Sequence, residues 1–96
     1  MEQQEKVKEL LFNAIDQINQ DLPENEQVTK STDTFLVGDS ANTDSLTLID
    51  LIVKTEKLIE DEFGVVLSLA EENAVFSEGT TVGTLIDHIC GRLKAK

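Results

Sequence analysis

The sequence predicts a single all-α domain, a small bundle of three main helices with a short helix before the last. Apolar residues recur at helical spacing in three long segments, and turn-forming residues separate these segments. A chain of 96 residues has the size of one domain, since typical domains run to about 100–150 residues. We expect one domain over residues 1–96, with helices at about 3–20, 45–63, 69–76 and 81–94.

The first helix is predicted from one apolar face. Its apolar residues follow the spacing that a helix uses to present one side to a core. They are Val7, Leu10, Leu11, Ala14, Ile15 and Ile18. Phe12 lies off this face and is expected at its edge or partly exposed. Leu22-Pro23 ends the segment, because a residue before proline is pushed out of the helical conformation.

The connection over residues 21–44 shows no sustained period. A structureless connection of this length is unusual in a small domain unless something anchors it. The apolar group Phe35, Leu36 and Val37 is the expected anchor. The polar residues after Gly38 are typical of a turn that leads into the second helix.

The second helix has a broad core-facing stripe. At about 100° per residue, seven residues fall within an arc of about 140°. They are Leu48, Leu51, Ile52, Thr55, Leu58, Ile59 and Phe63. Ile49 falls at the margin of this stripe, whereas Leu46 and Val53 fall on the opposite, outer side. Gly64 is the expected C-terminal cap.

The rest of the chain contains a connector, a short helix and the last helix. Residues 65–69 form a β-branched run that we interpret as a buried extended connector. Ser68 and Glu71 match a capping-box pattern for the short helix. The last helix follows Thr80-Thr81 and presents a face formed by Val82, Leu85, Ile86, Ile89 and Leu93. Cys90 is expected to pack beside this face.

The charge of the chain excludes some classes of partner. Its 19 Asp and Glu and 8 Lys and Arg give a formal net charge of -11, which repels nucleic acids and anionic membranes. Proteins with basic surfaces are favoured instead. One cysteine forms no internal disulfide, and no apolar amino-terminal stretch resembles a signal peptide or a membrane span. The expected location is the cytoplasm, and the expected state is a monomer.

The sequence contains little that could support catalysis. It lacks a G-x-S-x-G motif, and its only histidine, His88, has no apparent triad partner. The acidic run Glu60-Asp61-Glu62 spans three consecutive helical positions that point in different directions, which does not suit a metal site. We therefore expect a protein that is not an enzyme and holds no metal.

Ser45 is the residue with the most distinctive position, because it opens the second helix. Several backbone N–H groups at a helix start have no partner within the helix, so this end attracts anions. A serine placed there with its hydroxyl outward could carry an attached phosphodiester. It could also be only an N-terminal cap residue, which is the more common role of such a serine.

The segment Asp44-Ser45-Leu46, followed by an acidic amphipathic helix that ends in Glu60-Asp61-Glu62-Phe63-Gly64-Val65, resembles the modification site and second helix of the acyl carrier protein family. Residues 80–89 resemble the last helix of that family, and Thr34-Phe35 resembles the aromatic position before the motif. The resemblance covers roughly residues 5–93. It implies a four-helix bundle of acyl-carrier type, with three main helices and a short third helix.

The resemblance also implies a function. A phosphopantetheinyl transferase would use coenzyme A and Mg²⁺ to attach 4'-phosphopantetheine to Ser45, next to Asp44, which we expect to be the cap of the second helix and a local acid. Acyl groups would then be carried as thioesters on the thiol of this arm, for fatty acid, lipid or specialised acyl-chain biosynthesis. Acyl-loading and acyl-processing enzymes with basic docking surfaces would be the partners. The docking positions implied are Leu46, Asp50, Val53, Glu56 and Glu60.

Some features depart from the family pattern. The second helix is about one turn longer, the loop before the serine is about two residues longer, and Asn42 stands in a region usually served by glycine. Lys57 stands where an acid is expected, and Lys54 adds another positive charge. These departures favour a specialised carrier with dedicated enzymes. A peptidyl or aminoacyl carrier and an unmodified acidic helical interaction protein remain as alternatives.

Overall fold

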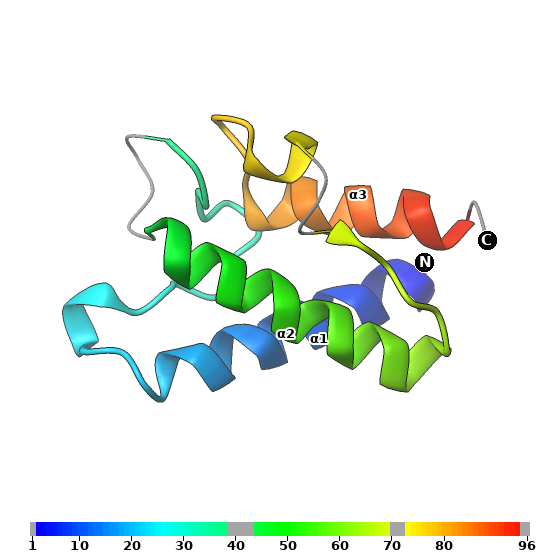
Figure 1. Ribbon diagram of the computed structural model, residues 1–96, viewed down its shortest axis with the longest axis horizontal. Helices are drawn as coiled ribbons and strands as arrows, with labels where there is room; N and C mark the ends of the chain where they lie inside the picture. Colours follow the sequence, from blue (N-terminus) through cyan, green and yellow to red (C-terminus); the bar gives the residue numbers. More distant parts are fainter. Residues whose placement is uncertain (1, 39–43, 70–72, 95–96) are drawn as a thin grey trace.

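The computed structural model describes residues 2–38, 44–69 and 73–94, and the described part of the chain is helical without a β-sheet. Three α-helices, α1 (Glu2–Asn19), α2 (Ser45–Phe63) and α3 (Val82–Lys94), are joined by segments that include the short 3-10 helices η1 (Glu24–Glu26) and η3 (Asn73–Phe76). Figure 1 shows α1 running antiparallel to both α2 and α3. The predicted all-α class is confirmed.

Helix α1 is the central element, because it packs against both α2 and α3. Its predicted apolar face is confirmed: all six residues of that face are buried, and Leu11, Ala14 and Ile15 are fully enclosed. Phe12 is half-buried beside the core, in agreement with its place at the edge of the face. The five predicted core residues of α3 are buried as well. Cys90 is half-buried and packs against them.

Helix α2 buries the predicted stripe. Five of its seven residues are buried, and Leu58 and Phe63 are partly buried against the core. Thr55 is the polar member of the stripe, and its hydroxyl donates to the carbonyl of Leu51 at 2.8 Å, so its burial leaves no unsatisfied hydroxyl. Gly64 ends the helix with a left-handed backbone (φ 68°), and its N–H donates to the carbonyl of Glu60 at 2.9 Å. The predicted cap is confirmed.

The connection between α1 and α2 is anchored by the predicted apolar group and by one further residue. Leu36 is buried and Val37 is partly buried against the core, whereas the side chain of Phe35 is 42% exposed. Val28 is a second buried anchor. The side chain of Asn19 holds it by two hydrogen bonds, to the N–H of Val28 at 2.8 Å and to its carbonyl at 2.9 Å.

The same connection is fastened to the start of α3. Phe35 and Thr81 form an isolated antiparallel bridge, and the N–H of Leu36 donates to the carbonyl of Thr80 at 2.8 Å. The N–H groups of Val82 and Gly83 donate to carbonyls of residues 34 and 32, each at 2.9 Å. We call residues 32–36 the strap. Successive side chains of an extended backbone point to opposite sides. Because the side chain of Leu36 points into the core, the neighbouring side chain of Phe35 points outward.

The segment between α2 and α3 is less regular than predicted. The helix expected over residues 69–76 is represented by η3, a 3-10 helix of four residues. Residues 70–72, which include Glu71 of the expected capping box, lie outside the described residues. In the connector, Leu67 and Leu69 are buried as expected, whereas Val66 is 67% exposed.

Helix α3 begins at Val82 because Thr81 caps it. The N–H of Thr84 donates to Thr81 Oγ1 at 3.1 Å, and the N–H of Thr81 donates to Thr84 Oγ1 at 2.8 Å. This reciprocal pair has the geometry of a capping box with threonine in both places. None of the helices described by the structure combines the length and the apolar character required to cross a membrane.

Candidate functional site

The start of α2 is organised by Asp44. This residue has an extended backbone, and its Oδ1 accepts a hydrogen bond from the N–H of Thr47 at 2.8 Å, while its carbonyl accepts one from the N–H of Leu48 at 2.9 Å. These are the bonds of an N-terminal cap, and the predicted role of Asp44 as the cap is confirmed. Ser45 follows it directly and is the first residue of a 19-residue helix.

The carboxyl of Asp44 is held in its charged form. Hydrogen bonding to the backbone N–H of Thr47, and next to its side chain, lowers the pKa of Asp44 below its usual value, with a smaller contribution from the N–H of Leu46. A negative charge is therefore fixed beside Ser45 at neutral pH. The outward orientation of the Ser45 hydroxyl and its modification stay predictions. Ser40 and Asn42 of the preceding turn lie outside the described residues.

The start of α3 offers an instructive contrast. There, the N–H groups of Val82 and Gly83 donate to carbonyls of the strap, and the N–H of Thr84 donates to the hydroxyl of Thr81. These protein groups take the positions that an anion would need at a helix start. At the start of α2, the cap is one aspartate adjacent to the serine. Of these two helix starts, the one beside Ser45 is the better candidate for carrying a phosphodiester.

The outer face of α2 carries a row of exposed apolar side chains. Leu46 is 79% exposed and Val53 is 49% exposed, which confirms their expected position on the outer side. Ile49, expected at the margin of the core stripe, is 42% exposed. We call Leu46, Ile49 and Val53 the apolar row. Scattered apolar residues are common on protein surfaces, but these three follow one line along a helix.

Charged residues surround the apolar row. Asp50 and Glu60 are exposed, as a docking role would require, and Glu56 is partly buried. Lys54 Nζ lies 3.8 Å from Asp50 Oδ1, one turn earlier on the helix. Lys57 is exposed. The implied docking residues thus share one side of α2, although docking itself stays a prediction.

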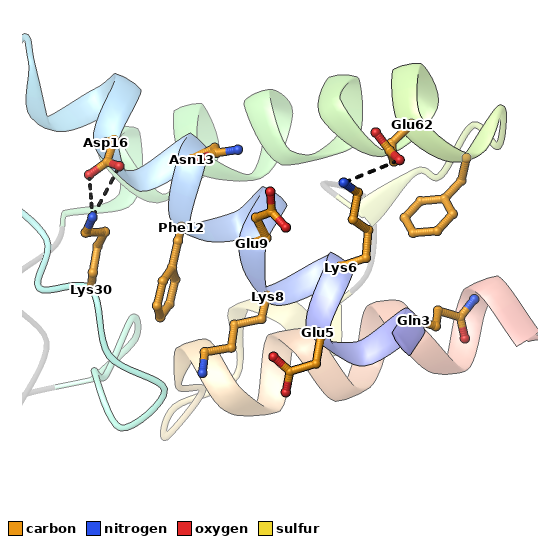
Figure 2. A pocket seen from close by; sticks show the side chains of 11 residues that line it. Gln3, Glu5, Lys6, Lys8, Glu9, Phe12, Asn13, Asp16, Lys30 and Glu62 are labelled. Atoms are coloured by element: carbon orange, nitrogen blue, oxygen red, sulfur yellow. Dashed lines mark hydrogen bonds and ion pairs between the residues drawn. The ribbon is translucent and has the colours of Figure 1, made fainter. Parts of the chain in front are cut away.

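A separate open groove of about 1120 Å³ follows the outer side of α1. Figure 2 shows side chains of α1, Lys30 and Glu62 around it, with Lys6 paired to Glu62 at 3.5 Å and Lys30 paired to Asp16 at 3.2 Å. The ammonium of Lys8 lies 5.6 Å from the centre of the Phe12 ring. The sequence pattern did not indicate this groove, because the residues that form it belong to three separate segments. It does not include Ser45.

Two further side chains with chemically reactive groups, Cys90 and His88, belong to α3. Burial, and next the nearby carboxylate of Asp87, raises the pKa of the Cys90 thiol, so little reactive thiolate forms at neutral pH. His88 is partly buried and lines a pocket of about 310 Å³ with Glu78 and Thr84. Among the described residues, no group of three or more His, Cys, Asp and Glu side chains is placed to hold a metal ion.

Comparison of the chain with protein-family models, with curated proteins and with solved structures found no match.

Proposed function

We propose that this chain is an acyl carrier protein that bears 4'-phosphopantetheine on Ser45. The observation that carries the proposal is the start of α2: a serine motif resembling the family's modification site coincides with the first residue of a long helix, directly after its aspartate cap. The polypeptide would supply the attachment point, and the arm would supply the thiol that carries acyl groups as thioesters.

The residues present fit this group. A phosphodiester attached at Ser45 would lie at the positive end of the α2 dipole, where helix starts favour anions. The cap carboxylate of Asp44 accepts from the helix backbone, so part of its charge is compensated locally. The raised pKa of the Cys90 thiol makes this side chain a weak competitor for acyl groups. The thiol of a flexible arm would instead be exposed and free to visit several active sites.

The overall arrangement supports the same proposal. We propose the four-helix bundle of acyl-carrier type, in which η3 takes the place of the short third helix. Its acidic outer surface and the apolar row on α2 suit brief docking on basic enzyme surfaces, since complementary charge speeds encounter and a small apolar contact permits release. The partners would be a phosphopantetheinyl transferase and acyl-loading and acyl-processing enzymes. The proposed form is a cytoplasmic monomer.

The test is modification of the intact protein. The chain is incubated with coenzyme A, Mg²⁺ and a promiscuous phosphopantetheinyl transferase, and its intact mass is measured. We expect the gain of one phosphopantetheine in the wild type and no gain in Ser45→Ala. Ser68→Ala is the matched control, because Ser68 is an exposed serine in the connector that follows the end of α2.

Two results would count against the proposal. Absence of any gain in the wild type would favour an unmodified acidic interaction protein. An equal gain in wild type and Ser45→Ala would place the modification on another residue. If Ser45 is modified, loading of the arm with acyl groups rather than aminoacyl groups by the enzymes of the source organism would separate an acyl carrier from a peptidyl or aminoacyl carrier.

A further inference from the structure

Lys57 continues the apolar row of α2. It lies eleven residues after Leu46 and four after Val53, so at 3.6 residues per turn its side chain projects within about 20° of Leu46 and about 40° of Val53. The row therefore reads, from the start of the helix, as three apolar side chains followed by one ammonium group. Lys57 is exposed, as Leu46, Ile49 and Val53 are.

The charge of Lys57 is available to a partner. Lys54 lies within 4 Å of the carboxylate of Asp50, whereas Lys57 has no ion pair within that distance in the described part of the chain. Glu60 and Asp61, one turn further along, are exposed as well. A single ammonium thus stands in line with the apolar row and is flanked by acids.

We propose that Lys57 determines which enzymes dock on the outer face of α2, the face that carries the apolar row. This inference rests on the proposed function. The complementary partner has an apolar surface for Leu46, Ile49 and Val53, basic residues toward Asp44 and Asp50, and an acidic residue opposite Lys57. A surface that is basic over its whole length places a like charge against Lys57. A like charge in an interface opposes the wrong partner, so Lys57 acts by repulsion as well as attraction.

The test uses a phosphopantetheinyl transferase with a basic docking surface and measures kcat/KM for modification of the whole chain. At low ionic strength Lys57→Glu should raise kcat/KM about three- to tenfold, and Lys57→Gln should give a smaller increase, because one repulsion is replaced by an attraction or removed. Both effects should shrink as salt is added. Lys94→Glu makes the same change in net charge on α3 and should have a much smaller effect.

A charge-swap cycle makes the test specific to position. The basic residues of the transferase docking surface are reversed to glutamate one at a time. One of these transferase variants should modify the wild-type carrier faster than the Lys57→Glu carrier. This order is the reverse of the one expected with the unaltered transferase. Far-UV circular dichroism and Tm of each carrier variant verify that the fold is retained.

The outcomes separate the inference from the proposed function. If the wild type is modified at Ser45 but Lys57→Glu leaves kcat/KM unchanged, or Lys94→Glu raises it equally, the role of Lys57 is wrong and the carrier function stands. If neither the wild type nor any variant is modified at Ser45, the proposed function is wrong and the inference fails with it.

Discussion

At the scale of single residues, Asp44 links helix capping to pH. Its carboxylate accepts from the N–H of Thr47, and this bonding lowers its pKa in the folded state. A group whose pKa is lower in the folded state than in the unfolded state stabilises the fold above its unfolded pKa. That stabilisation is lost as the pH falls through the folded-state value. The contribution of Asp44 is therefore complete at neutral pH and disappears in acid.

Replacement of Asp44 should reveal this dependence. Asp44→Ala removes the cap, so its Tm at pH 7 should lie several degrees below that of the wild type. The difference should narrow between about pH 5 and pH 2, because protonation weakens the same interaction in the wild type. Thermal unfolding followed by circular dichroism at several pH values measures both effects.

Asp44→Asn is the matched control, since an asparagine caps a helix about as well without a charge. Its Tm at pH 7 should stay close to that of the wild type. Two results would contradict a pH-dependent stabilisation by the Asp44 cap. One is an equal Tm for Asp44→Ala and the wild type at pH 7, and the other is a Tm difference that stays unchanged in acid.

At the scale of elements, the ends of the helices depend on backbone conformation. Gly64 ends α2 with a φ of 68°. Residues with a Cβ atom adopt this left-handed backbone conformation only at a cost in free energy. A Cβ at this position would meet no atom within 4 Å. The preference for glycine here is therefore conformational and not steric.

Gly64→Ala should lower the free energy of unfolding by about 1 kcal/mol, the cost of a left-handed alanine. Gly91→Ala provides the matched control: Gly91 lies within α3, and a Cβ there also meets nothing within 4 Å. Because alanine is more favourable than glycine inside a helix, Gly91→Ala should raise the free energy of unfolding by about 0.5–1 kcal/mol. Urea unfolding measures both changes. A loss in Gly91→Ala, or no change in Gly64→Ala, would contradict this account of the two glycines.

The strap is the other feature at this scale. It supplies carbonyl partners for the first N–H groups of α3, and the second of these groups belongs to Gly83. A Cβ on Gly83 would lie 3.0 Å from the carbonyl oxygen of Thr32. Here a Cβ would press on the backbone of the strap, so glycine is favoured by close approach, in contrast to Gly64.

At the scale of the whole molecule, the net charge of -11 opposes folding into a small volume. Among the described residues, the ion pairs Lys6–Glu62, Lys30–Asp16 and Lys54–Asp50 lie at the surface, where each contributes little. The apolar core around α1 must therefore provide most of the stability against this repulsion. Added salt weakens the repulsion among the negative charges, because charges separated by more than about 10 Å are screened at 0.1 M.

The Tm should accordingly rise with ionic strength, by a few degrees between low salt and about 0.1 M, the range in which screening grows most. Potassium chloride and tetramethylammonium chloride should act alike if screening is the cause. Glu24→Lys, which changes an exposed acid of η1, should reduce the slope. A Tm that falls with salt would show that attractive ion pairs outweigh the repulsion.

The sequence by itself determined the parts of the structure whose signals are local. The apolar faces of α1, α2 and α3, the cap at Asp44 and the stop at Gly64 were predicted and found, because helical spacing and terminal residues act within a few turns. The exposure of Leu46 and Val53 followed from the same geometry. The candidate attachment residue, Ser45, was located by its motif and its place at a helix start.

Only the tertiary structure decided how the segments between the helices are held. The strap pairs backbone groups, which are common to all residues and leave no pattern in the sequence. The clamp of Asn19 on Val28 joins residues nine positions apart, and Phe35 is turned outward because its backbone pairs with Thr81. The 42% exposure of Ile49 was likewise set by the limits of packing on α2, since a position at the margin of a stripe is buried only if a neighbouring element covers it.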